Sequence, residues 1–232
     1  MIESAHSSAA RLRDVAFTPR EGRQRPGSVR IAVIGEANSG KTTLVNTLLG
    51  APILPTSVAA HTTLPTLIGY SGKSSLVAEV PGGKRIPLAW EHLHHPPRRD
   101  VRRVHVGVPL NNLRGVCVLD TPALSLDNEA GNRRTLHACR GADLLIWCTP
   151  AIQAWKHSEQ SLWLMLSMKL RGRGILAATF ADQIQSDGDA HRLMARLQAD
   201  AGCHFRQIVL IAGMSATGGT VRTPSPARAA RL

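Results

Sequence analysis

Residues 29–49 read VRIAVIGEANSGKTTLVNTLL. The first part of this stretch is an apolar run typical of a buried strand, and the last part has the apolar spacing of a helix. Between them, Gly35–Thr42 fits the pattern G-x-x-x-x-G-K-[ST]. Its glycines allow the loop to approach a phosphate chain closely, so that backbone N–H groups and the positive end of the helix dipole face the phosphate oxygens. The stretch therefore predicts a strand, a phosphate-binding loop and a helix.

Two side chains at the end of this loop have the chemistry that a nucleotide requires. Lys41 is expected to neutralise the β- and γ-phosphates, and Thr42 is expected to place its hydroxyl on a magnesium ion. The alternative is a glycine turn that joins a strand to a helix and binds nothing. Because the strand, the helix and the Lys-Thr pair fit together, the sequence favours a site for a magnesium–nucleoside triphosphate.

The composition is that of a globular α/β domain. The chain has 232 residues, of which 43% are hydrophobic and 19% charged, and this suffices for one domain with a full core. It contains no run of 18 apolar residues, and its first ten residues lack the apolar core of a signal peptide, so we expect a cytoplasmic protein. The four cysteines show no C-x-x-C spacing, which argues against a zinc site or a disulfide framework.

The net charge of +12 is concentrated in three segments. Residues 1–30 contribute +3, residues 82–103 contribute +4 and residues 217–232 contribute +3. We predict a disordered basic arm over 1–28, a nucleotide-binding domain over 29–216 and a disordered basic tail over 217–232. Basic segments of this kind suit contact with an anionic membrane or RNA, although an Arg-rich background with solvated tails explains them equally well.

Patterns of strands and helices alternate along the rest of the chain. Strands are expected at 66–70, 75–80, 101–108 (an edge strand), 115–119, 143–148, 174–179 and 207–211. Helices are expected at 128–140, 157–170 and 189–201, a loop over the nucleotide at 50–64 and irregular structure at 81–100. This alternation predicts a three-layer α/β fold of the P-loop NTPase kind, with helices on both faces of a mostly parallel sheet. Trp147, Trp155 and Trp163 recur every eight residues and are expected to pack in the core or in an interface.

Two further features are expected to complete a magnesium site. Asp120 ends the apolar run 115–119, and ligands of open α/β sheets bind at the carboxyl ends of the strands. Its carboxylate is expected to hold magnesium through a water molecule, across from the Thr42 hydroxyl. The alternative is an aspartate that caps a turn before proline. Thr62 and Thr63 lie in the loop between these elements, and one of them is expected to close over the γ-phosphate and the metal.

Together these motifs resemble the GTPase domain of bacterial dynamin-like proteins, with Era-type small GTPases as close relatives. The resemblance covers roughly residues 29–216 and rests on the loop 35–42, the stretch 44–50, Leu54-Pro55, Thr62-Thr63 and Asp120-Thr121-Pro122. It implies magnesium-dependent hydrolysis of GTP to GDP and phosphate, and often nucleotide-controlled dimerisation or work on membranes. By position, Lys41 and Thr42 become the phosphate and magnesium residues, Thr62 or Thr63 the threonine of switch I, and Asp120 the aspartate of switch II. Asn38 falls where the family places polar groups near the attacking water.

The base-recognition element of this family, [NT]-K-x-D, corresponds to Thr179–Asp182. The Asp182 carboxylate would accept hydrogen bonds from guanine N1–H and N2–H₂, a pattern that adenine lacks. Phe180 replaces the lysine, and its ring is expected to stack on the base, while ordinary turn chemistry is the rival interpretation. The resemblance also places Ser215 and Ala216 in the last base-contacting loop. Ala123 replaces the glycine of D-x-x-G, which predicts slow switching or slow hydrolysis because alanine resists φ > 0.

The predicted site thus has three overlapping groups of residues. The catalytic candidates are Lys41, Asn38, Thr62 and Thr63. The nucleotide-binding candidates are Gly35, Glu36, Ala37, Asn38, Ser39, Gly40, Lys41, Thr42, Thr43, Asp120, Thr179, Phe180, Asp182, Ser215 and Ala216. The metal candidates are Thr42, Thr62, Thr63 and Asp120.

The predicted function is that of a Mg²⁺-dependent, dynamin-like GTPase switch that is located in the cytoplasm, either free or peripherally bound to a membrane. A nucleotide-loaded scaffold with little turnover, an Era-like ribosome-assembly GTPase and a P-loop kinase are the alternatives. Because no closing helix is evident after residue 215, we expect a homodimer or a partner chain to supply missing helical elements.

Overall fold

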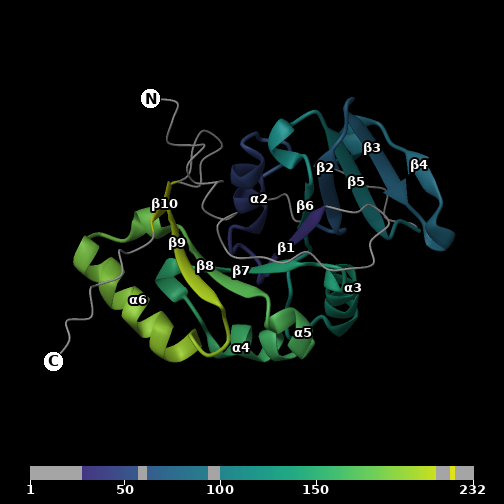
Figure 1. Cartoon of the computed structure of the whole chain (residues 1–232). Coiled ribbons are helices and arrows are strands. Elements are labelled where there is room, and N and C mark those ends of the chain that lie inside the picture. Colours follow the sequence, from purple (N-terminus) through teal and green to yellow (C-terminus); the bar gives the residue numbers. More distant parts are fainter. Residues whose placement is uncertain (1–27, 57–61, 94–99, 213–219, 223–232) are drawn as a thin grey trace.

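Seven residues, Val29–Gly35, form strand β1 in the interior of a ten-stranded sheet (Figure 1). The computed structural model describes residues 28–56, 62–93, 100–212 and 220–222. Across these residues the sheet has the order β10-β9-β8-β7-β1-β6-β2-β5-β3-β4, and helices cover both of its faces. The expected three-layer α/β fold is confirmed.

The half of the sheet around β1 is parallel. Strands β6 (Val116–Asp120) and β7 (Leu144–Pro150) pair with β1 on its two sides. Strand β8 (Gly174–Thr179) pairs with β7, and β9 (Gln207–Ala212) pairs with β8. These strands are largely continuous apolar runs because side chains on both of their faces are buried in the two hydrophobic clusters of the sheet. All their carboxyl ends therefore meet at one edge of the sheet.

The other half of the sheet is mostly antiparallel. Strand β2 (Thr66–Tyr70) pairs with β6, and β5 (Arg103–Val108) lies between β2 and β3 (Ser75–Glu79). The prediction of an edge strand at 101–108 is therefore wrong. Strand β5 buries every second residue against the core and has a partner on each side. The edge is instead β4 (Arg85–Pro87), a short exposed strand in the region predicted to be irregular, where a proline is tolerated.

Within the described residues, five α-helices cover the sheet. Helix α2 (Lys41–Leu49) lies on one face, and α3 (Glu129–Cys139), α4 (His157–Leu164), α5 (Met168–Arg171) and α6 (Asp187–Ala201) lie on the other (Figure 1). Two hydrophobic clusters of buried residues fill the two sides of the sheet. Short 3-10 helices complete the described elements: η1 (Pro81–Gly83), η2 (Trp90–Leu93), η3 (Asn111–Leu113), η4 (Ala151–Gln153) and η5 (Ala181–Gln183).

Helix α3 matches its predicted bounds to within one residue at each end, and the other two predicted helices differ by more. The single helix predicted at 157–170 is broken after Leu164 and resumes at Met168, and the turn between them buries Leu166 in the core. Helix α6 begins two residues earlier than predicted. The side chain of Ser186 accepts a hydrogen bond from the backbone N–H of Asp189, and this N-cap fixes the start of the helix.

The three tryptophans pack together in the core, as predicted. Trp147 and Trp163 are fully buried, with ring centroids 5.8 Å apart and planes at 90°. Trp155 lies 6.2 Å from Trp147 and 5.0 Å from Phe205. The cluster holds the segment between β7 and α4 on the face of the sheet that α3, α4, α5 and α6 cover.

The predicted arm and tail lie largely outside the described residues. Within the predicted tail, Thr220–Arg222 form β10, which pairs antiparallel with β9. Of the helices that the structure describes, none combines the length and apolarity needed to cross a bilayer.

Candidate nucleotide-binding site

The loop between β1 and α2 has a backbone that depends on its glycines. Gly35 has φ 149°, and a Cβ atom built there would lie 2.4 Å from the Cys148 carbonyl oxygen and 2.8 Å from Ser39 Oγ. Gly40 has φ 77° directly before α2. Asn38 also has a positive φ, 56°, a conformation that asparagine tolerates better than most residues. The loop thus has the tight turns that a phosphate-binding loop requires.

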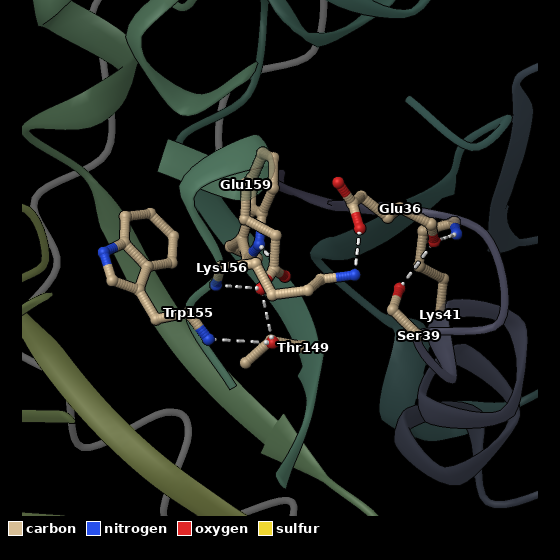
Figure 2. Close-up of polar contacts among 8 residues, drawn as sticks. Glu36, Ser39, Lys41, Thr149, Trp155, Lys156 and Glu159 are labelled. Atoms are coloured by element: carbon tan, nitrogen blue, oxygen red, sulfur yellow. Dashed lines mark hydrogen bonds and ion pairs between the residues drawn. The ribbon is translucent and has the colours of Figure 1, made fainter. Parts of the chain in front are cut away.

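Lys41 is a buried cation at the start of α2. Its side chain is 7% exposed, and its Nζ donates a hydrogen bond of 2.6 Å to the backbone carbonyl of Glu36 (Figure 2). Ser39 Oγ donates to the same carbonyl at 2.8 Å. Burial lowers the pKa of Lys41, and the negative charges of Asp120 and Glu36 oppose this shift. A buried ammonium that donates to a neutral carbonyl is placed to bind an anion, because an anion would accept a stronger, charge-assisted hydrogen bond than the carbonyl does.

Two hydroxyls and a carboxylate meet beside Lys41. Thr42 Oγ1 and Thr62 Oγ1 lie 3.2 Å apart, and each donates a hydrogen bond to Asp120 Oδ2, at 3.0 Å and 2.9 Å. Asp120 is 1% exposed, and its other oxygen, Oδ1, has no hydrogen-bond partner within the described part of the chain. Burial raises the pKa of Asp120, while the bond from Thr62 and the charge of Lys41 act in the opposite direction. Thr63, the neighbouring candidate, is exposed.

These three residues fit a magnesium ion. Hydroxyl and carboxylate oxygens are ligands that this hard cation prefers, and adjacent ligands of an octahedral site with Mg–O distances of about 2.1 Å lie about 3 Å apart. The separation of the Thr42 and Thr62 oxygens matches that spacing. Asp120 Oδ1 is buried and has no hydrogen-bond partner among the described residues, so it is an oxygen that a cation or a water bound to it would satisfy.

The predicted base-recognition element begins next to the phosphate loop. Thr179 is fully buried, and its Oγ1 lies 3.0 Å from the Ser39 carbonyl and 3.1 Å from the Thr149 carbonyl, so this hydroxyl ties the end of β8 to the loop. Phe180 follows in the left-handed conformation, with φ 57°. Asp182 lies exposed in η5. Ser215 and Ala216 lie outside the described residues.

The segment after Asp120 runs alongside the phosphate loop. Thr121 Oγ1 donates to the Val33 carbonyl at 2.8 Å, and the N–H of Leu124 donates to the Gly35 carbonyl at 3.1 Å. Ala123, expected to resist a positive φ, does not have one. In this conformation the backbone accepts alanine without strain, so any cost of the missing glycine would arise only in another conformation.

The carboxylate of Glu159, which was not predicted from the sequence, is buried and stabilises the first turn of α4. Glu159 is fully buried and accepts hydrogen bonds from Trp147 Nε1 at 3.0 Å, Thr149 Oγ1 at 2.9 Å and the N–H of Lys156 at 2.9 Å (Figure 2). The Lys156 ammonium in turn lies 2.6 Å from Glu36 Oε2, in the phosphate loop. The spacing of Lys156 and Glu159 is that of a capping box, but lysine at the cap position conceals the pattern.

A second missed residue anchors the loop after α2. Asn46 is 4% exposed, donates to the Leu54 carbonyl at 2.8 Å and accepts from the Leu54 N–H at 2.9 Å. An amide on the buried face of a helix was the available signal, because such a group must find partners. Asn46 thereby fixes the start of the segment that leads to Thr62.

These features define a P-loop nucleotide-binding protein. They are a loop that requires glycine, a buried lysine, and three oxygen atoms spaced as ligands of Mg²⁺ at the carboxyl ends of the parallel strands. The profile of the Dynamin family matches residues 31–175, and the chain belongs to that family. The resemblance inferred from the motifs is confirmed.

Two curated relatives illustrate the likeness in sequence. Dynamin-like protein 2 of Campylobacter jejuni is 33% identical over 138 residues, which make up 57% of this chain and 22% of the relative. The bacterial dynamin-like protein of Nostoc punctiforme is 24% identical over 183 residues, or 71% of this chain and 26% of the relative. The chain therefore spans about a quarter of the length of these relatives.

Solved structures share the fold at lower sequence identity. A structure of an oligomerised bacterial dynamin pair, described as sensing and tethering membranes over long range, aligns with a TM-score of 0.59 and 22% identity, covering 79% of this chain and 30% of that one. The structure of Era in complex with MgGDPNP and a segment of 16S ribosomal RNA aligns with a TM-score of 0.53 and 16% identity, covering 88% and 60%. These likenesses establish the fold of a P-loop GTPase.

Proposed function

We propose that this chain binds GTP together with Mg²⁺ and hydrolyses it to GDP and phosphate. The observation that carries the proposal is the convergence of the Thr42 and Thr62 hydroxyls on the buried Asp120 carboxylate, directly beside the buried Lys41. A lone phosphate loop would need only the glycines and the lysine. The added oxygen triangle supports a site for a metal-bound triphosphate.

The residues of the loop and of α2 would bind and orient the phosphate chain. Backbone N–H groups of residues 36–42 would surround the β-phosphate, and Lys41 would bridge the β- and γ-phosphates. Thr42, Thr62 and Asp120 would hold the metal. When bound, Mg²⁺ neutralises charge on the β- and γ-phosphate oxygens.

The reaction transfers the γ-phosphoryl group to water. An O–P bond forms between water and the γ-phosphorus, the bond to the β-phosphate oxygen breaks, and the water loses a proton to the medium. Asn38, exposed on the loop in a left-handed turn, and Thr63, next to the metal candidate Thr62, are proposed to position the water. Most of the rate enhancement would come from positioning and charge neutralisation.

Selectivity for guanine is assigned to the element after β8. Asp182 would accept hydrogen bonds from guanine N1–H and N2–H₂, Phe180 would stack on the base, and Ser215 and Ala216 would belong to a further loop that contacts the base. The bond from Thr179 to the phosphate loop supports this assignment, because it places the start of the element beside the loop.

The chain is further proposed to act as a switch through self-association or a partner chain. The bacterial dynamin pair supports this, since it is an oligomer described as acting on membranes. Three apolar side chains at the α4–α5 junction are exposed by 46% to 81%, and a partner helix would cover them: Leu164, Met165 and Met168. Basic segments would add peripheral contact with anionic lipid.

Calorimetric titration of GTP, GDP and ATP in the presence and absence of Mg²⁺ tests the function. We expect GTP to bind at least about tenfold more tightly than ATP, Asp182→Ala to remove that preference, and Lys41→Ala to abolish binding. Phosphate release in a single turnover tests hydrolysis, with and without anionic vesicles. Equal affinity for GTP and ATP would refute the guanine assignment, and tight binding without phosphate release would refute hydrolysis.

A further inference from the structure

Lys156 occupies a helix position for which lysine is poorly suited. It is the N-cap residue of α4, where side chains that accept hydrogen bonds are favoured and where the helix dipole repels a cation. The carboxylate of Glu159 meets the backbone N–H of Lys156, but the lysine itself cannot cap the helix. A residue that is unfavourable for its local secondary structure often has a functional contact elsewhere, made by its side chain.

The backbone before Lys156 is strained in a way that fixes its direction. Trp155 has φ 60°, a conformation costly for a bulky residue, and its N–H donates to Thr149 Oγ1 at 3.4 Å. Its ring packs edge-on against Trp147 and Phe205. The aromatic cluster and the buried Glu159 therefore hold the turn, and the turn points Lys156 toward the phosphate loop (Figure 2).

The side chain of Lys156 ends on the second residue of the phosphate loop. Its ammonium lies 2.6 Å from Glu36 Oε2, across 120 positions of sequence, and this bond raises the pKa of Lys156. Glu36 is 18% exposed, and its backbone carbonyl is the acceptor for Lys41 Nζ. A carboxylate at this point carries a negative charge close to where the polyanionic ligand of the loop would bind.

We propose that Lys156 is a positioning and charge-compensating residue of the nucleotide site, which neutralises Glu36 so that the loop can accept a polyphosphate. The proposal rests on the function proposed above. This role differs from that of a purely structural salt bridge, because the charge of Lys156 would favour binding of the nucleotide and the charge of Glu36 would oppose it. Loss of the lysine leaves an uncompensated carboxylate beside the phosphates, whereas loss of the carboxylate leaves an extra cation there.

The test measures the affinity of Mg²⁺ with GDP and with a non-hydrolysable GTP analogue in four proteins. These are the wild type, Lys156→Ala, Glu36→Gln and the double variant. Because a unit charge within about 10 Å of the phosphates acts through partly screened solvent, we expect Lys156→Ala to weaken binding about 3- to 10-fold and Glu36→Gln to tighten it about 3- to 10-fold. The double variant should return to within about twofold of the wild type, and both shifts should shrink in high salt.

Two controls separate this role from a structural one. Lys156→Arg keeps the charge and should bind within about twofold of the wild type. The Glu129–Arg133 pair on α3 supplies a matched control, and Glu129→Gln and Arg133→Ala should leave the affinity unchanged. If Lys156→Ala does not fold, the tightening expected for Glu36→Gln still decides the question.

The outcomes are distinct. Opposite shifts in the two single variants with recovery in the double variant support the proposal. Weaker binding in both single variants, or no change in either, overturns it while the proposed function stands. A wild-type protein that binds neither nucleotide overturns both.

Discussion

Replacing Gly35 by alanine tests whether the phosphate loop is built as described. A Cβ atom there would lie 2.4 Å from the Cys148 carbonyl oxygen, a backbone atom at the point where β1 and β7 pair. Contacts under 3.0 Å force something to move, and here the neighbour is a strand rather than a flexible side chain. The residue would also have to keep φ 149°. Strand β1 must therefore shift away from β7, or the loop must change its path.

The cost has two parts of similar size. A φ in the sparsely populated region of Gly35 costs a residue other than glycine about 1–3 kcal/mol, and overpacking against a rigid neighbour costs about 1–3 kcal/mol. We therefore expect Gly35→Ala to lower the free energy of unfolding by about 2–6 kcal/mol, which for a domain of this size lowers Tm by roughly 4–24 °C. Nucleotide binding should be lost, because the N–H groups of the loop would no longer converge.

Two glycines elsewhere separate the two parts. Gly82 has φ 82° and no atom within 4 Å of a built Cβ, so Gly82→Ala should cost only the conformational part, about 1–2 kcal/mol. Gly72 has neither constraint, and Gly72→Ala should change stability by less than about 1 kcal/mol. Urea denaturation of the three variants gives the comparison. A Gly35→Ala protein no less stable than Gly82→Ala would refute the steric argument.

Three further predictions follow from the site. Thr62→Ala should weaken Mg²⁺-dependent nucleotide binding about tenfold and Thr63→Ala by less than about threefold, measured by calorimetry, and equal effects would contradict the selection of Thr62 as the metal ligand. Because burial raises the pKa of Asp120, the folded state binds this proton more tightly than the unfolded chain, so stability should fall as pH rises from the unfolded-state pKa through the folded-state pKa. Asp120→Asn should remove that fall in a series of Tm values against pH while abolishing metal-dependent binding, and an unchanged pH profile would refute the assignment. Glu159→Ala should destabilise the fold by about 2–4 kcal/mol in urea because it strands buried donors, and a smaller loss than that of Thr149→Val, at about 1 kcal/mol, would contradict this reasoning.

Most of the fold could be predicted from the sequence because its parallel strands are continuous apolar runs bounded by turn residues. The antiparallel half was less predictable. Strand β4 has only three residues, the last of which is Pro87, and whether β5 is an edge strand depends on which segment pairs with its far side. The pattern of apolar and polar residues along the chain indicates neither the existence of β4 nor the position of β5 in the sheet. The broken helix α4–α5 was likewise missed because Leu166 keeps an apolar pattern across a turn that tertiary packing creates.

In the candidate site, too, the residues of a local motif could be predicted, whereas contacts between distant segments could not. The glycines, Lys41 and Thr42 follow from one contiguous motif, since the chemistry of a phosphate loop is local. Asp120 could be predicted because it ends a buried strand. The choice between Thr62 and Thr63 needed coordinates, because neighbouring residues of an irregular loop differ only in direction. The contact of Lys156 with Glu36 spans 120 positions and has no local signature at either end.

The bond from the Thr179 hydroxyl to the Ser39 carbonyl has a consequence for the choice of ligand. It joins the end of β8 to the phosphate loop, so the start of the base-recognition element and the loop keep a fixed spacing. On the proposed function, a nucleotide would contact both places with one molecule, and its second contact would form at a high effective concentration. A free base or an inorganic polyphosphate would reach only one of them and would gain no such advantage. One buried hydroxyl would thereby make the site selective for the length of its ligand as well as for its chemistry.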